Sequence, residues 1–113
     1  MEESILNSIK KLLGIAADYT HFDTDIIIHI NTVFMTLNQL GVGPSEGFRI
    51  KDSITQWNEY IEDDDDLDGV KTYMYLRVKL IFDPPLNGSI QATMKESIRE
   101  FEWRLNIQAE SEE

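Results

Sequence analysis

The side chains best suited to bind a ligand lie in an acidic run, Glu59–Asp68, which holds seven of the chain's 21 acidic residues. Part of this run matches the D-x-D-x-D-G opening of a calcium-binding EF-hand loop: Asp64, Asp66, Asp68 and Gly69. Such a loop also needs a bidentate glutamate six positions after the glycine, where this sequence has Tyr75. The residues from Val70 onward follow a helical pattern, whereas the loop must wrap around its ion. We therefore interpret the acids as a solvated surface at a helix N-terminus, where negative charge is favourable.

Other catalytic and metal-binding chemistry finds little support in the sequence. The two histidines, His21 and His29, are eight residues apart and cannot form a metal site by themselves. The chain has no cysteine, which excludes disulfides, thiolate ligands and a cysteine nucleophile. It also has no G-x-S-x-G motif, no glycine-rich phosphate loop and no evident serine–histidine–acid set. We expect neither an enzyme nor a cofactor or metal site.

Arg77 stands out because it falls inside an apolar helical stripe, close in angle to Met74 and Val78. A buried guanidinium group needs a carboxylate or carbonyl partner. Two kinds of partner would meet this requirement. One is an acidic residue on the last helix of the same chain, and the other is a group in a neighbouring subunit.

Trp103 lies away from the apolar stripe of the last predicted helix, between Arg99 and Arg104. Arg99 is one turn earlier and could stack on the indole ring. Glu100 precedes Arg104 by four residues, which is the favourable orientation for a helical ion pair. Trp103 is therefore either part of a surface stack or a binding hot spot, since tryptophan and arginine are enriched at hot spots.

Helices must position these residues. The central stretch, Val70–Pro85, is apolar almost all round a helix, which is typical of a helix surrounded by protein, and Pro84 and Pro85 end it. Its stripe is formed by Val70, Tyr73, Met74, Val78 and Ile81. We expect this helix to begin just after the acids of residues 62–66. The fold class is all-α, a small bundle of about five helices with one long loop around residues 41–51.

The other helices are predicted from apolar spacing and capping residues. A first helix spans roughly residues 3–13 and ends at Gly14, and a second runs from a cap at Asp23 or Thr24 to about Leu40, before Gly41. A third starts at Asp52 or Ser53, with a shared face of Ile54, Trp57 and Ile61. The last starts at Asn87 or Ser89, with a stripe of Ile90, Met94, Ile98, Phe101 and Leu105, and we expect fraying from Gln108 onward.

Two features of this framework are suited to contacts with other molecules. Ile28 and Met35 lie seven residues apart, opposite the core stripe of the second helix, and are either scattered exposed side chains or a subunit contact. The loop of residues 41–51 is long for a helix connection, and long loops are often functional. Phe48 and Ile50 are its expected anchors.

Length and charge restrict the remaining possibilities. At 113 residues the chain is expected to be one domain, residues 1–107, with an acidic tail at residues 108–113. The sequence shows no secretory signal and no apolar run long enough to span a membrane. The net charge of −11 repels phosphates, which argues against a chain that grips nucleic acid.

Several ordered blocks of sequence resemble one known family. They are IKKLLGI (residues 9–15), DTDIIIHINTVFMTLNQLGVGP (residues 23–44), KTYMYLRVKLIFDPP (residues 71–85) and EFEWRLN (residues 100–106). Together they resemble the small head–tail connector proteins of long-tailed bacteriophages, also called adaptor or head-completion proteins. The resemblance extends from about residue 9 to residue 107, and the acidic run and the extreme termini lie outside it.

The resemblance implies an all-helical, nonenzymatic protein that is made in the host cytoplasm and becomes part of the virion, at the junction of capsid and tail. Such proteins form a ring, usually of twelve subunits, beneath the portal protein. They contact the portal partly through C-terminal helical segments and receive a stopper or tail-completion protein below. DNA passes through the centre of the ring without specific binding.

On this interpretation, we expect a group of side chains to contact the portal or the next subunit: Ile28, Met35, Phe48, Arg77, Arg99, Trp103 and Arg104. The acids Asp63, Asp64, Asp65 and Asp66 would line the DNA passage, where like charge prevents phosphates from sticking. The alternative is a small acidic cytoplasmic protein-binding module or nucleic-acid mimic that never forms a ring. An enzyme is the third possibility.

Overall fold

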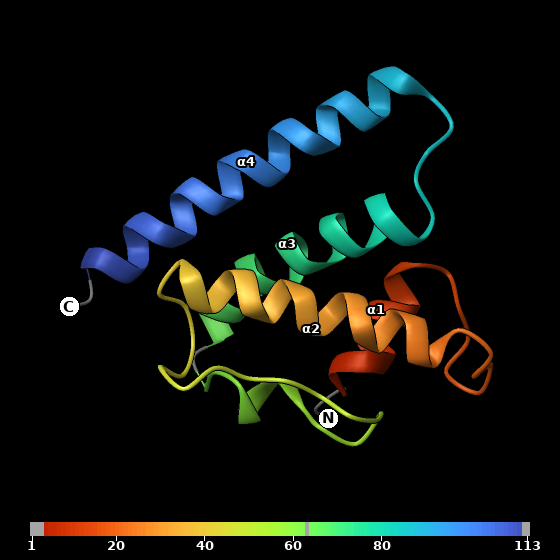
Figure 1. The fold of residues 1–113 in the computed structure, drawn as a ribbon, viewed down its shortest axis with the longest axis horizontal. Coiled ribbons are helices and arrows are strands. Elements are labelled where there is room, and N and C mark those ends of the chain that lie inside the picture. Colours follow the sequence, from red (N-terminus) through yellow and green to blue (C-terminus); the bar gives the residue numbers. More distant parts are fainter. Residues whose placement is uncertain (1–3, 63, 112–113) are drawn as a thin grey trace.

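Helix α3 (Asp64–Phe82) is the element against which the other helices pack. The computed structural model describes residues 4–62 and 64–111, without the side chains of residues 64–66 and 111. Helices α1 (Ile5–Leu12), α2 (Asp23–Gln39) and α4 (Gly88–Ser111) all contact α3, and α3 lies between α2 and α4 in Figure 1. The molecule measures 40 × 35 × 23 Å.

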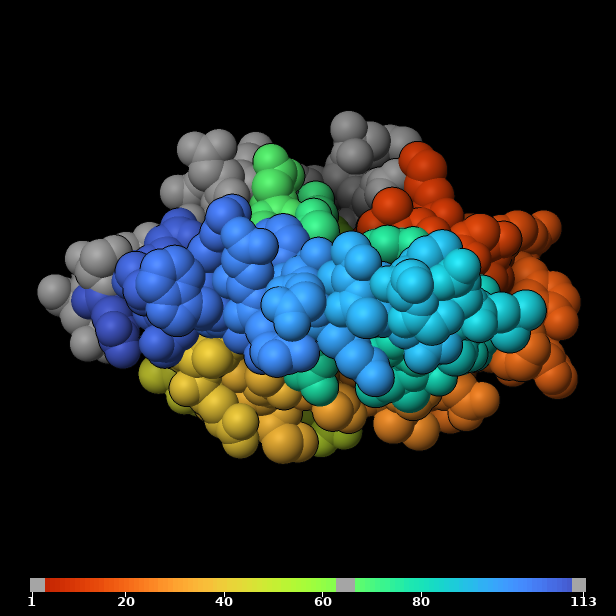
Figure 2. All heavy atoms as spheres, turned by 90° about the horizontal axis from the view of Figure 1, so that it is seen from above, coloured from red at the N-terminus to blue at the C-terminus, as the bar shows by residue number. Residues whose placement is uncertain are grey.

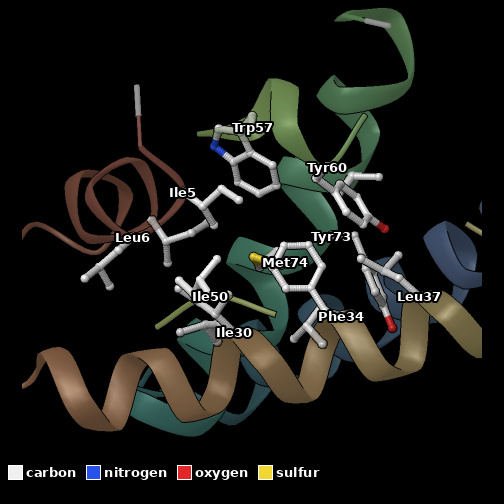
Figure 3. Close-up of a cluster of buried hydrophobic side chains, with 14 of the residues drawn as sticks. Ile5, Leu6, Ile30, Phe34, Leu37, Ile50, Trp57, Tyr60, Tyr73 and Met74 are labelled. Carbon is white, nitrogen blue, oxygen red and sulfur yellow. The ribbon is translucent and has the colours of Figure 1, made fainter. Parts of the chain in front are cut away.

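The apolar face of α3 forms the centre of the core. Val70, Tyr73, Met74 and Val78 are fully buried, as their spacing predicts. Side chains from α1, α2 and the long loop surround them, including Ile5, Phe34 and Ile50 (Figure 3). Ile81 was expected in the same stripe, but it is 54% exposed. The reason is that α3 and α4 separate toward the loop that connects them (Figure 1), where Ile90 is also half exposed.

Glycine ends the first two helices in the way their positions predict. Gly14 and Gly41 have φ values of 83° and 86°, the left-handed region that favours glycine. After each glycine the chain closes a Schellman motif: Ile15 N–H donates to Lys10 C=O at 2.8 Å, and Val42 N–H donates to Leu37 C=O at 2.9 Å. The N-terminus of α2 differs from the prediction. Its N-cap is Phe22, because the carboxylate expected to cap it, that of Asp23, instead contacts Lys10.

The predicted third α-helix is reduced to a single 3₁₀ turn, Trp57–Glu59. The segment before it is extended, because Thr55 C=O accepts a 2.9 Å hydrogen bond from Ile5 N–H at the start of α1. Of the side chains expected to share a helical face, Trp57 is buried and donates to Ser8 Oγ at 2.7 Å, whereas Ile54 is 77% exposed. The hydrogen bond from Ile5 to Thr55 therefore takes the place of the first turn of the predicted third helix.

The ends of the two long helices also differ from the sequence-based boundaries. Helix α3 begins at Asp64, inside the acidic run rather than after it, so part of the run forms its first turn. Negative charge at a helix N-terminus is favourable, which explains why the run does not break the helix. Helix α4 begins after Asn87, as predicted for a cap. The Asn87 side-chain oxygen accepts hydrogen bonds from the backbone N–H groups of Ser89 and Ile90. It continues through Gln108 to Ser111, where we expected fraying.

The described residues therefore contain four α-helices and one 3₁₀ turn, and no strand beyond an isolated bridge between Ser4 and Gln56. The all-α class and the long loop at residues 41–51 are confirmed, with four helices in place of about five. In the part of the chain that the structure describes, no helix combines the length and hydropathy needed to cross a bilayer. The division into a domain of residues 1–107 and a tail stays a prediction.

Candidate interface surfaces

Trp103 is a bare aromatic side chain on the outer side of α4, the helix that lies across the face shown in Figure 2. It is 65% exposed. The stack on Arg99 does not form, because Arg99 pairs with Glu96 instead, at 3.2 Å. Arg104 forms the predicted ion pair with Glu100. Because Arg99 and Arg104 are each paired with a glutamate of α4, neither covers the indole ring, which is exposed for contact with another molecule.

Ile107 extends this apolar surface by one turn. It follows Trp103 by four residues, so the two side chains lie on the same side of α4. Ile107 is 43% exposed. The sequence-based expectation did not include it, although its spacing from Trp103 was the available signal.

The outer face of α2 carries a second pair of exposed apolar side chains. Ile28 and Met35 are 57% and 63% exposed, on the side opposite the buried residues Ile30 and Leu37. The exposed Thr32 lies between them along the helix. The structure thus places the pair on the surface, as the spacing predicts.

Arg77 joins three helices through hydroxyl groups. Its Nη1 donates to Thr36 Oγ1 of α2 at 2.7 Å and to the Tyr73 hydroxyl at 3.1 Å. The Tyr73 hydroxyl in turn donates to Glu102 Oε2 of α4 at 2.6 Å. The acid expected on the last helix is therefore present, but Tyr73 stands between it and the guanidinium group. No carboxylate among the described residues lies within ion-pair distance of Arg77.

The environment of Tyr73 changes its acidity. Burial raises the pKa of the Tyr73 hydroxyl to about 12, and its hydrogen bond to Glu102 acts in the same direction, while Arg77 opposes them. Burial also raises the pKa of Tyr60, which lies between the long loop and the core. Both hydroxyls are neutral near pH 7, so they act as hydrogen-bond donors to Glu102 and to Val42 C=O.

Phe48 fixes the long loop to the core rather than presenting an open contact. Its ring packs against those of Phe34 and Tyr60, each with its centroid 5.1 Å away. Ile50 is buried, as expected of an anchor. Asn31, which the sequence did not single out, binds both backbone groups of Ile50, at 2.8 and 2.9 Å. An amide side chain that matches one N–H and one C=O is a strong loop clamp.

The acidic run has helical rather than ion-wrapping geometry. Helix α3 includes Asp64–Gly69, so this stretch cannot curl around a calcium ion as an EF-hand loop must. No group of three or more histidine, aspartate or glutamate side chains within metal-binding reach occurs in the described residues. Asp63 and the side chains of Asp64, Asp65 and Asp66 lie outside the described part, so their place along a DNA passage stays a proposal.

Lys10 is a fully buried cation that the sequence-based reasoning missed. Its ammonium group donates to Ala17 C=O at 3.0 Å and to Tyr19 C=O at 2.8 Å. Asp23 Oδ1 lies 2.7 Å away and balances the charge. Lys10 thereby fastens the α1–α2 loop to both helices. The available signal was its position four residues after the core residue Leu6.

These features define a small all-α protein whose exposed apolar side chains lie on the outer faces of two helices. A family model described as "Phage connector protein" matches residues 5–112, and the chain belongs to this family. It is thus a structural connector protein of a bacteriophage that associates with head or tail components, and it is not an enzyme. No curated protein and no solved structure matches the chain.

Proposed function

We propose that this protein forms a ring, of twelve copies in the virion, at the junction between capsid and tail. In this proposal the ring joins the portal protein to a stopper or tail-completion protein and lets DNA pass through its centre. Family membership supports the connector role, and the exposed helical faces support the assembly. Closing a ring requires that one face of each copy meet a different face of the next.

The observation that carries the proposal is the exposure of Trp103 on α4. Monomeric soluble proteins expose single apolar side chains without consequence, but an uncovered tryptophan next to a second apolar residue is typical of a binding hot spot. We assign Trp103 and Arg104 to the portal. The outer face of α2, with Ile28 and Met35, then supplies contacts to the next copy.

Replacing Trp103 with alanine tests the assignment. Since Trp103 is mostly exposed, Trp103→Ala keeps the helical circular dichroism of the wild type. Removing a hot-spot tryptophan lowers portal affinity about tenfold or more in co-sedimentation with assembled portal. Ile54→Ala, which truncates a still more exposed side chain on the loop before the 3₁₀ turn, is the matched control and retains wild-type binding. Unchanged binding of Trp103→Ala would remove the assignment.

The acidic run has a separate role in the proposal. Asp63, Asp64, Asp65 and Asp66 face the DNA passage, where their charge prevents phosphates from binding to the wall. The test converts all four to asparagine, which changes the net charge from −11 to −7. DNA then binds to portal–connector assemblies more tightly at low salt in a filter assay. The control converts four acids outside the run to their amides: Asp18, Asp25, Glu46 and Asp52. Equal DNA retention by both variants contradicts the lining role.

A further inference from the structure

A groove between α3 and α4 combines positive charge with apolar surface. It has a volume of about 350 Å³, and it is lined by Arg77, Leu80, Ile81, Lys95, Ile98 and Arg99. Three of the chain's ten lysine and arginine residues thus meet at one place, in a protein whose net charge is −11. The described acids do not neutralise the groove fully, for reasons that differ at each cation.

Lys95 is exposed and forms no ion pair with any described residue. Arg99 pairs with Glu96, but both side chains are more than 70% exposed, and such surface pairs contribute little. Arg77 donates to Thr36 and Tyr73 through Nη1. Glu102, the other acid nearby, accepts from Tyr73. The groove therefore presents donors suited to additional carboxylates, beside the half-exposed side chain of Ile81.

We propose that this groove binds the acidic C-terminal segment of an adjacent copy, residues 107–113. This inference rests on the ring proposed above. The segment brings Glu110, Glu112 and Glu113, three carboxylates against the three cations, and Ile107 supplies an exposed apolar side chain at its start. An acidic segment with one apolar anchor complements a groove that has the opposite charge and an apolar floor.

The segment cannot occupy the groove of its own chain. Helix α4 is continuous from Gly88 to Ser111, so the 11 residues between Arg99 and Glu110 hold these two positions about 17 Å apart along the helix axis. Residues 112 and 113 add at most about 7 Å of extended chain, which is too short to return. The contact must come from another copy, with the end of one α4 meeting the middle of the next. Such a head-to-tail contact is heterologous and generates a ring when its rotation closes.

Charge reversal and its rescue test the contact. Lys95→Glu/Arg99→Glu weakens association between copies at least tenfold in sedimentation or in ring formation on the portal, with the circular dichroism unchanged. Adding Glu112→Lys/Glu113→Lys to that variant restores association to within about threefold of wild type. The matched control adds Asp18→Lys/Glu46→Lys instead, the same charge change elsewhere, and restores nothing. Equal restoration by both pairs would show a general charge effect and overturn the inference.

Cross-linking gives a measurement that does not depend on charge. Because the chain has no cysteine, Lys95→Cys and Glu110→Cys can be made separately and mixed, so that any disulfide between them joins two copies. On the portal, this pair cross-links at least tenfold faster than a mixture of Lys95→Cys and Asp18→Cys. Equal rates in rings that form normally overturn the groove contact and leave the proposed function standing. Failure of the wild type to bind the portal or form a ring overturns the proposed function itself.

Discussion

The Tyr73 hydroxyl of α3 donates a 2.6 Å hydrogen bond to the Glu102 carboxylate of α4. The same hydroxyl accepts from Arg77, which also donates to Thr36 of α2. One phenol group thus couples the three longest helices and brings a carboxylate and a guanidinium group together without direct contact. This hydrogen bond is one of the contacts that hold α4, the helix that carries Trp103, against α3.

Tyr73→Phe removes the coupling while it preserves the ring in the core. The Glu102 carboxylate and the Arg77 guanidinium group each lose a partner in a partly buried place, so we expect the free energy of unfolding to fall by about 1–3 kcal/mol. Urea denaturation measures the change. Tyr75→Phe is the control, because residue Tyr75 is half-buried and its hydroxyl forms no hydrogen bond with the described residues; it changes stability by less than about 0.5 kcal/mol. Equal effects of the two variants would contradict the coupling.

Stability decreases at alkaline pH, and Tyr73 contributes to the decrease. Its pKa is about 12 in the folded protein against an ordinary value of 10.0, so between these values the unfolded chain has lost a proton that the folded chain retains. The stabilisation is complete below pH 10 and is lost as the pH rises toward 12. At pH 11 the loss from Tyr73 is about 1.4 kcal/mol. Urea titrations at pH 8 and pH 11 measure it. Tyr73→Phe reduces the pH dependence without abolishing it, since burial also raises the pKa of Tyr60. An identical dependence in both proteins would rule out Tyr73.

Lys10→Met leaves Asp23 without its buried cation and releases the carbonyl groups of Ala17 and Tyr19. Breaking one side of a buried ion pair is costly, and we expect a loss of about 3–5 kcal/mol in thermal or urea unfolding. Lys51→Met, which removes an exposed cation of the long loop, is the control and changes stability by less than about 0.5 kcal/mol. A Lys10→Met protein as stable as wild type would mean that the charge contributes nothing to the fold.

Gly43→Ala separates a steric clash from backbone strain. Gly43 and Gly47 both have positive φ, 84° and 89°, so alanine is strained at either position. At Gly43 the added Cβ would lie 2.5 Å from the Tyr60 ring, whereas at Gly47 nothing lies within 4 Å. We expect Gly47→Ala to cost about 1 kcal/mol and Gly43→Ala about 2–4 kcal/mol in urea unfolding. Equal costs would show that the Tyr60 ring moves aside freely.

The parts of the fold that were predictable depend on local rules. Gly14 and Gly41 end their helices because the left-handed conformation of a Schellman motif favours glycine, whatever the rest of the fold. The stripe from Val70 to Val78 is buried because a helix with so little polar surface must be surrounded by protein. Ile28 and Met35 are exposed because they lie opposite such a stripe.

The parts that were missed depend on where distant segments meet. The spacing of Ile54, Trp57 and Ile61 is helical, but Thr55 C=O accepts a hydrogen bond from Ile5. No local sequence pattern predicts this contact between distant segments. The burial of Lys10 depends on carbonyl groups 7 and 9 residues later in a loop of irregular shape. In the candidate surfaces, exposure was predictable and the partner was not, since a single chain shows one side of a contact.

Lys10 also couples the stability of the N-terminal segments to one another. Its buried ammonium group needs the oxygen atoms of Ala17, Tyr19 and Asp23, so opening the loop or the start of α2 leaves a buried charge without partners. We therefore expect residues 4–23 to open as one cooperative unit in native-state hydrogen exchange.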